Sequence, residues 1–232
     1  MSASSTLART RVQAILTRNA DGSQQFGLRD QFRKLTEQIG LTAARSWLVR
    51  HIELTQEFRE LLADRTVLFG DTEDTGFGEA DELCELSLVY PDKSVAFDSL
   101  IKPSVPINAG ATGVHGITNA MVEYAPTFGE CADQIEQALA DVRIVFWYNS
   151  EFDTRMIEQT EYAAERSITW PRFVDIMGSF AVWVGDWNTK QNGYRWPKLE
   201  GGHRALGDCL EMIELVELMS TSDLEYAGSL LS

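Results

Sequence analysis

Residues 66–77 read TVLFGDTEDTGF, a short apolar run that ends in acidic residues and a glycine-containing turn. The β-branched and apolar residues 66–69 predict a central strand. Asp71 and Glu73 follow two positions apart, and side chains at i and i+2 of a strand point to the same face. Both carboxylates can therefore reach one site, where hard oxygen ligands suit Mg²⁺ or Mn²⁺. A pair of solvated strand-end acids is the alternative.

The apolar patterns around this strand predict an α/β fold, a mixed sheet with helices on its faces. Further strands are expected over 84–90 and 94–101, joined as an antiparallel hairpin, and over 142–147 and 173–176. Helices are expected over 127–140, 150–165, 177–184 and 205–219. Pro103 and Pro106 mark an irregular loop, and residues 185–202 are loop-like.

A third acidic residue, Asp153, lies at the start of the helix predicted after the strand 142–147. The carboxyl end of a central strand is where open α/β sheets build binding sites. The helix dipole also favours an acid in the first turn, with Ser150 or Asn149 as the cap. A role in stabilising the helix terminus is therefore the alternative for Asp153.

A histidine and a fourth acidic residue, His203 and Asp208, lie five positions apart near the chain's last predicted helix. On a continuous helix they would be turned by about 140° and would not share a face. Gly201 and Gly202 place the histidine in a loop and Asp208 in the helix. A histidine with a pKa near 6.5 suits a general base at neutral pH. A surface histidine near a helix start is the alternative.

Taken together, these motifs resemble the DEDDh branch of the DnaQ-like 3′–5′ exonuclease family. The matching stretches occur in the family's order over about residues 66–219 and read VLFGDTEDTG, KPSVPINAGATGVHGITNAMVEYAPTF, YNSEFD and HRALGD. The resemblance implies an RNase H-like fold, here preceded by a small N-terminal helical segment.

The resemblance also implies roles for individual residues. Two divalent cations, Mg²⁺ or Mn²⁺, are expected on four carboxylates, those of Asp71, Glu73, Asp153 and Asp208, with His203 as the general base. Segments that hold the terminal nucleotide in relatives match Thr72, Thr75, Gly76, Phe77, His115, Gly116, Asn149 and Phe152. For His115, loop packing is the alternative.

The expected activity is metal-dependent hydrolysis of single-stranded 3′ ends, releasing nucleoside 5′-monophosphates, with DNA favoured over RNA. An RNA or oligoribonucleotide exonuclease and a polymerase-associated proofreading subunit are alternatives within this class. A non-catalytic module that binds nucleic-acid ends is the rival from another class, although it has no physical need for an intact carboxylate set.

Two features depart from the family pattern. Tyr148 stands where many relatives have histidine before Asn149. Between Asp175 and His203, several aromatic residues alternate with cations, namely Trp183, Trp187, Tyr194 and Trp196 with Lys190, Arg195, Lys198 and Arg204. Such residues suit stacking on single-stranded bases, and they equally suit packing over a sheet edge.

The charge of the chain is distributed unevenly. The 232 residues carry a net charge of −15, yet residues 1–65 hold ten Lys+Arg and seven Asp+Glu, a net of +3. An acidic body can bind phosphates when divalent cations mediate the contact. Three segments are predicted: 1–64, a helical extension for packing, homodimerisation or docking to a polymerase; 65–221, the exonuclease domain; and 222–232, a C-terminal tail.

The cysteines and the apolar runs bear on localisation. Cys84, Cys131 and Cys209 form no CxxC pair, so buried thiols in a reducing compartment are expected. No apolar run is long enough for a membrane span, and the N-terminal residues show no secretory signal. A cytoplasmic location without a membrane partner is expected.

Overall fold

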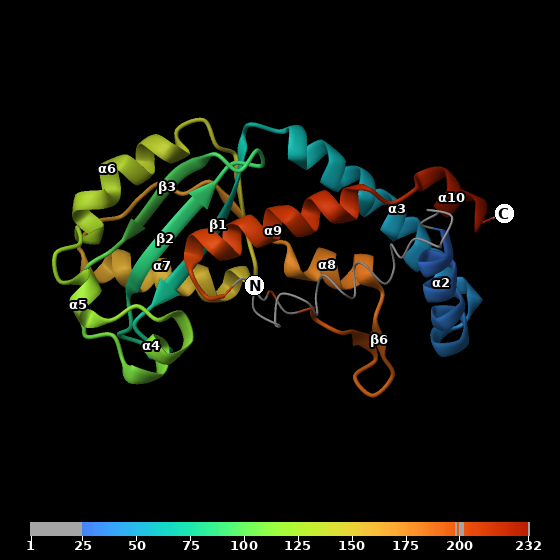
Figure 1. Cartoon of the computed structure of the whole chain (residues 1–232), viewed down its shortest axis with the longest axis horizontal. Coiled ribbons are helices and arrows are strands. Elements are labelled where there is room, and N and C mark those ends of the chain that lie inside the picture. Colours follow the sequence, from blue (N-terminus) through green and yellow to red (C-terminus); the bar gives the residue numbers. More distant parts are fainter. Residues whose placement is uncertain (1–24, 198, 200–201, 232) are drawn as a thin grey trace. The chain divides into compact units, whose positions relative to one another are not determined.

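The structure is a computed structural model that describes residues 25–197, 199 and 202–231 (Figure 1). Within these residues, five strands form a mixed sheet in the order β3-β2-β1-β4-β5, which confirms the predicted fold class. They are β1 (Val67–Asp74), β2 (Leu83–Val89), β3 (Val95–Leu100), β4 (Ile144–Trp147) and β5 (Arg172–Asp175). β1 pairs antiparallel with β2 and parallel with β4, so β1 is the central strand.

The chain divides into two compact units. One contains residues 64–176 and 201–213, and the other contains residues up to 63, 177–200 and 214–232. Residues 25–63 therefore share a unit with two later segments and do not form one alone. The predicted segments 1–64, 65–221 and 222–232 do not coincide with these units, and their division of function stays a prediction.

Helices pack on both faces of the sheet in the first unit (Figure 1). This unit contains α4 (Ala109–His115), α5 (Asn119–Val122), α6 (Phe128–Leu139), α7 (Ser150–Ala163) and the first part of α9 (Ala205–Ser220). Ile135 of α6 and Met156 of α7 belong to one apolar core with Leu68 and Trp147 of the sheet. On the other face, the thiol of Cys209 in α9 lies 3.5 Å from the carbonyl oxygen of Phe69.

The central strand is longer than its apolar residues predict. The sequence indicated a strand over 66–69, whereas β1 continues to Asp74 because Asp71 to Asp74 stay paired with β2. Packing explains why residue 70 is a glycine, since a Cβ there would lie 2.7 Å from the Trp147 ring. The acidic residues therefore belong to a paired strand. Just before them, at Phe69, this strand pairs with β2 on one edge and with β4 on the other.

The loop predicted at Pro103 and Pro106 leads into two short helices, α4 and α5. Asn108 caps α4, because its side chain accepts a 2.8 Å hydrogen bond from the Ala111 N–H. Gly116 ends α4 in the left-handed region, at φ 76°, which glycine adopts without strain. Pro103 and Pro106 lie in an irregular segment, as predicted, and local capping stabilises a helix after it that the sequence did not predict.

The second unit contains the N-terminal helices. Its elements are α2 (Gln25–Ile39), α3 (Leu41–Ala63), α8 (Met177–Val184), β6 (Trp187–Asn188), β7 (Gly193–Tyr194) and α10 (Leu224–Ser229). Helices α2 and α3 are separated at Gly40, whose φ of 85° lies in the left-handed region that glycine adopts without strain. One expectation is corrected, because the segment 185–202 contains the β6–β7 hairpin. The predicted C-terminal tail contains α10.

Packing accounts for the buried aromatic residues of this unit. Trp183 is buried, and its indole N–H donates to Thr55 of α3. His51 of α3 stacks on the Trp183 ring at 4.4 Å, and burial lowers the pKa of this histidine to about 4. Trp187 and Tyr194 pack edge to face, whereas Trp196 is 59% exposed. The base-stacking alternative therefore applies only to the exposed part of this segment and stays a prediction.

The three cysteines are free and buried, as expected. Among the described helices, none combines the length and the apolar character needed to span a bilayer.

Candidate metal centre

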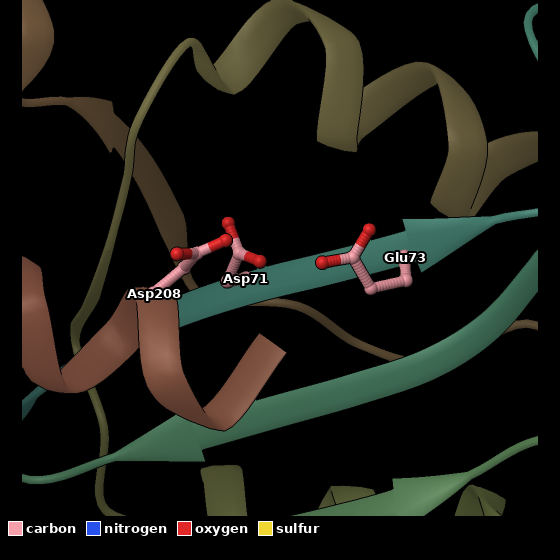
Figure 2. Close-up of side chains that lie close together, drawn as sticks. All are labelled: Asp71, Glu73 and Asp208. Carbon is pink, nitrogen blue, oxygen red and sulfur yellow. The ribbon is translucent and has the colours of Figure 1, made fainter. Parts of the chain in front are cut away.

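Three carboxylates converge on one side of the central strand (Figure 2). Asp71 and Glu73 come from β1, and Asp208 comes from the first turn of α9. Each offers an oxygen, and these oxygens lie within 4.8 Å of one another. Alternation along β1 explains why Asp71 and Glu73 share a face. A helix packed over that face supplies the third carboxylate from a residue 135 positions later in the sequence.

Like charge and burial both act against ionisation of this cluster. Burial, followed by the charges of Asp208 and Glu85, raises the pKa of Glu73 to about 8. Burial and the charge of Glu211 raise the pKa of Asp208 to about 7. Asp71 also has a pKa well above its usual range, because of burial and the neighbouring carboxylates, Asp153 first among them. A divalent cation would relieve this repulsion.

The residues present fit such a cation. Oδ1 of Asp208 is buried and has no hydrogen-bond partner among the described residues. A buried polar atom without a partner costs free energy unless an ion or water satisfies it. The donor set consists of carboxylate oxygens alone, which hard divalent cations prefer over nitrogen and sulfur ligands.

Asp153 lies beside this cluster without belonging to the group of three. It is 4% exposed, and its Oδ1 accepts a 2.7 Å hydrogen bond from the Thr72 hydroxyl. Burial raises the pKa of Asp153 to about 7, while that hydrogen bond lowers it. Asn149 is the N-cap of α7, at φ 70°, and makes no side-chain capping bond. Of the two caps considered, Ser150 is the first helical residue instead.

His203 is exposed and lies two residues before the first residue of α9, in the loop position that the two glycines indicated. Its φ of 55° is in the left-handed region, which is uncommon for a residue with a side chain. The backbone of His203 makes a hydrogen bond to the Asp208 carboxylate. The histidine and the carboxylate are thereby held together, although they do not share a helix face.

The turn after β1 depends on its glycine. The Thr75 hydroxyl donates to Asp81, and the Gly76 N–H donates to the Asp74 carboxylate. A Cβ on Gly76 would lie 2.1 Å from the Asn108 side chain. The predicted nucleotide-contact residues Thr72, Thr75 and Gly76 are therefore buried and bonded within the protein, and a contact with substrate stays a prediction.

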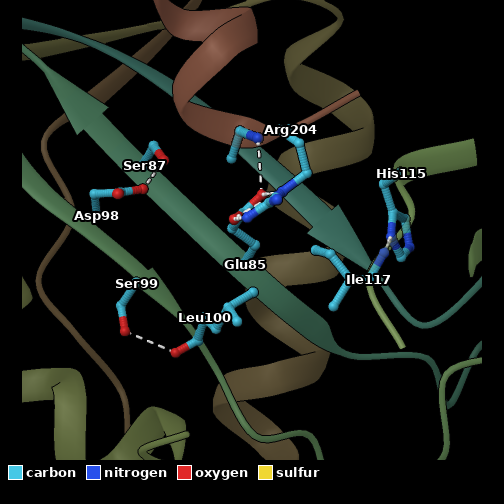
Figure 3. Close-up of polar contacts among 9 residues, drawn as sticks. Glu85, Ser87, Asp98, Ser99, Leu100, His115, Ile117 and Arg204 are labelled. Atoms are coloured by element: carbon cyan, nitrogen blue, oxygen red, sulfur yellow. Dashed lines mark hydrogen bonds and ion pairs between the residues drawn. The ribbon is translucent and has the colours of Figure 1, made fainter. Parts of the chain in front are cut away.

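His115 has both ring nitrogens in hydrogen bonds, and Figure 3 shows the one with Ile117. Nδ1 accepts from the Ile117 N–H at 3.0 Å, so Nε2 donates to the carbonyl oxygen of Asp74, also at 3.0 Å. Burial lowers the pKa of His115. These contacts join the end of β1 to the loop after α4, which favours the packing role over a nucleotide contact. Gly116 supplies the turn at that point.

The exposed Phe77 and the half-buried Phe152 form an aromatic step at the start of α7. Phe77 is 71% exposed, and its ring centroid lies 5.7 Å from that of Phe152. The guanidinium of Arg155 lies over the Phe152 ring at 5.3 Å. A cavity of about 580 Å³ lies against this step, lined by Asn149, Glu151, Phe152, Thr154, Arg155 and Glu158. An aromatic face beside a cation suits a nucleobase next to a phosphate.

Sequence reasoning missed Glu85. It lies in β2, is 3% exposed and pairs in register with Glu73. Its charge contributes to the raised pKa of Glu73 and Asp208. The available signal was a glutamate within the mostly apolar run CELSLVY. A charged side chain in a buried strand is rare unless it has a partner of opposite charge.

The comparison with known families decides the assignment. A family model described as "Exonuclease" matches residues 68–216. This chain belongs to the DnaQ-like exonuclease family, in its DEDDh branch. Exonucleases of this family are divalent-metal-dependent hydrolases, and the carboxylate cluster of the present member agrees with that dependence.

Two relatives support the family assignment. The chain is 31% identical over 190 residues to the uncharacterized exonuclease CP81 of Escherichia phage 186, covering 74% of this chain and 96% of the phage protein. It is 30% identical over 162 residues to a DNA polymerase III subunit epsilon-like protein of Rhodobacter capsulatus. That match covers 64% of this chain and only 23% of the longer protein.

Solved structures of exonucleases share the fold. Escherichia coli Exonuclease I, in complex with a 5cy-dA13 oligonucleotide, superposes with a TM-score of 0.55 at 18% identity, covering 71% of this chain and 42% of that one. The nuclease domain of 3′hExo, a DEDDh family member bound to rAMP, gives a TM-score of 0.50 at 14% identity. That match covers 65% of this chain and 90% of the nuclease domain.

Proposed function

We propose that this exonuclease removes nucleotides from single-stranded 3′ ends, DNA being favoured, and releases nucleoside 5′-monophosphates. The observation that carries the proposal is the convergence of Asp71, Glu73 and Asp208 within 4.8 Å. Asp153 completes the acidic set, because its charge acts on Asp71. A binding module would have no use for buried carboxylates that repel one another.

Four carboxylates, Asp71, Glu73, Asp153 and Asp208, would hold two ions, either Mg²⁺ or Mn²⁺. When bound, such a pair would lower the pKa of the attacking water and neutralise charge on the scissile phosphate. The protein's own contribution is positioning, which is most of what phosphoryl transfer requires.

His203 would act as the general base. Its exposure and the hydrogen bond from its backbone to Asp208 support this role. A ring nitrogen would take the proton of the attacking water while the new O–P bond forms. The bond between phosphorus and the 3′ oxygen of the preceding nucleotide then breaks, and that oxygen receives a proton from solvent.

The aromatic step of Phe77 and Phe152 would stack on the terminal bases through its exposed Phe77, since every base offers a π face. This contact explains a preference for unpaired ends. The DNA oligonucleotide in the Exonuclease I structure supports DNA as substrate, while rAMP in the 3′hExo structure keeps the RNA alternative open. The epsilon-like relative supports the proofreading alternative.

End-labelled oligonucleotides test the proposal. Single- and double-stranded DNA and RNA of equal length, labelled at either end, are incubated with Mg²⁺, Mn²⁺ or EDTA. We expect a 5′ label to yield a ladder of shortening products, a 3′ label to yield one mononucleotide at once, and EDTA to stop both. Shortening from the 5′ end, or hydrolysis that persists in EDTA, would contradict the proposal.

His203→Ala tests the base. We expect turnover to fall by about 10²- to 10⁴-fold, the range attributed to general acid–base catalysis, while Mn²⁺ affinity changes little. An equal loss of turnover and of metal affinity would show that the histidine acts on the metal site instead.

A further inference from the structure

Glu85 adds one more buried carboxylate beside the three that converge in the cluster of Asp71, Glu73 and Asp208. It stands opposite Glu73 in the β1–β2 register, and side chains at such paired positions are close neighbours. Like charges at paired positions destabilise a sheet. A glutamate at this position therefore needs a partner that compensates its charge. The identity of that partner indicates the role of Glu85.

The partner is the start of α9 (Figure 3). The Arg204 Nε–H donates to both Glu85 oxygens, at 3.1 and 2.9 Å, and Nη2 donates to Oε1 as well. The backbone N–H of Ala205 donates to Oε2 at 2.9 Å. The Glu85 carboxylate thus accepts hydrogen bonds from two nitrogens of the Arg204 guanidinium and from the first backbone N–H of α9. We call this arrangement of Glu85, Arg204 and Ala205 the β2–α9 clamp.

The clamp acts on the segment that carries two of the proposed functional residues. His203 comes directly before Arg204, and Asp208 lies one turn after it, with its N–H donating to the Arg204 carbonyl oxygen at 3.0 Å. The first N–H groups of a helix lack partners within the helix, and an anion there is favourable. Glu85 supplies that anion from a strand that also pairs with β1.

We propose that Glu85 and Arg204 are positioning residues that hold the start of α9 against β2, so that Asp208 faces Asp71 and Glu73. Neither residue is a metal ligand in this proposal, because the Glu85 oxygens are directed at Arg204 and Ala205. The inference rests on the proposed function for the role of the site, but the clamp itself is measured through metal binding and needs no hydrolysis.

The sign of one charge change separates positioning from simple electrostatics. Arg204→Ala removes a positive charge beside an acidic site, so electrostatics alone predicts tighter binding of a cation. The clamp predicts weaker binding, by about 10-fold or more, as is typical when a partner that orients a metal ligand is lost. Arg204→Lys keeps the charge but loses the fork, and it should also weaken binding. Arg143→Ala, which removes an exposed partner of Asp64 in the same unit, is the matched control.

Mn²⁺ affinity is measured by calorimetry on the full chain, together with circular dichroism to verify folding. Tighter or unchanged Mn²⁺ binding by both Arg204 variants would overturn the proposal. If Arg204→Ala does not fold, the Mn²⁺ affinity of Arg204→Lys alone decides the test.

Chemical rescue gives a second test. Because Arg204 is partly exposed, millimolar guanidinium should restore Mn²⁺ binding to Arg204→Ala but leave the Mn²⁺ affinity of Arg143→Ala unchanged. A wild-type protein that binds Mn²⁺ but hydrolyses no ends would refute the proposed function and leave this measurement valid.

Discussion

The Thr72 hydroxyl donates a 2.7 Å hydrogen bond to Oδ1 of Asp153 and so joins the central strand β1 to the first turn of α7. Thr72 lies between Asp71 and Glu73, and alternation turns its side chain to the opposite face of the strand. One short stretch of β1 therefore provides two carboxylates of the cluster on one face and, on the other, the contact that orients the residue from α7.

Thr72→Val should impair the site without removing a carboxylate. Because the Thr72 hydrogen bond lowers the pKa of Asp153, its loss should move the acidic limb of the activity profile to higher pH. We expect turnover at pH 7 to fall by about 10-fold or more, the usual effect of losing a partner that orients a metal ligand. Thr72→Ser keeps the hydroxyl and is the control. Superimposable pH profiles of the valine variant and the wild type would refute this role.

Asp208→Asn should abolish hydrolysis and yet stabilise the metal-free protein. The substitution removes one of several carboxylates that repel one another, so thermal unfolding in EDTA at pH 8.5 should occur about 2–4 °C higher if about 1 kcal/mol of repulsion is relieved. Asp133→Asn, at a side chain that is 93% exposed in α6, should change neither property. A lower unfolding temperature for the Asp208 variant would show that repulsion between the carboxylates does not destabilise the metal-free protein.

The metal-free protein should lose stability as pH rises from 6.5 to 8.5. In the folded protein, Asp153, Asp208 and Glu73 have pKa values of about 7, 7 and 8, whereas unfolded carboxylates release their protons near pH 4. The folded state thus binds more protons up to about pH 8, and its free energy of unfolding falls as pH rises through this window.

Scanning calorimetry in EDTA at several pH values measures this loss of stability. His51 opposes this loss only weakly: because its pKa is about 4 when folded and near 6.5 when unfolded, it adds about 0.4 kcal/mol of stability as pH rises through this range. Saturating Mn²⁺ should abolish the loss, adding about 2.7 kcal/mol when present at one hundred times its dissociation constant. Stability that stays constant or rises between pH 6.5 and 8.5 without metal would contradict the raised pKa values.

Gly70→Ala should destabilise the sheet by about 1–3 kcal/mol, the usual cost of overpacking a core. The added methyl group would lie 2.7 Å from the Trp147 ring, which packs across β1 at this point. Gly129→Ala in α6 meets no atom within 4 Å and should be neutral or stabilising. Urea unfolding of the two variants, followed by tryptophan fluorescence, makes the comparison. Equal urea midpoints of the two variants would show that the Trp147 ring moves aside without loss of stability.

The sequence allowed the sheet and its carboxylates to be predicted because their signals are local. Apolar runs indicated the strands, and the i, i+2 spacing placed Asp71 and Glu73 on one face. The same signals gave the wrong end for β1, since Asp71 to Asp74 contain no apolar residue and are held in the strand by pairing with β2. A pairing partner is a tertiary property that a polar run does not reveal.

Other features depend on contacts between distant residues. Helix α4 contains two glycines and is stabilised by its Asn108 cap and by His115, whose ring bonds Asp74. The role of Glu85 requires Arg204, which lies 119 residues later. Helical periodicity indicates α3 as an amphipathic helix but cannot say that Trp183 packs on it. For these residues, the sequence shows the side chains but not their neighbours.

The second compact unit is assembled from three separate stretches of chain, and this has a practical consequence for anyone who wishes to excise a minimal nuclease. A fragment that starts at residue 64 would keep every proposed metal ligand. It would also strip α3 from α8, leaving the buried rings of Phe180 and Trp183 in water. Aggregation of such a fragment would then report on an uncovered apolar surface, not on the chemistry of the site.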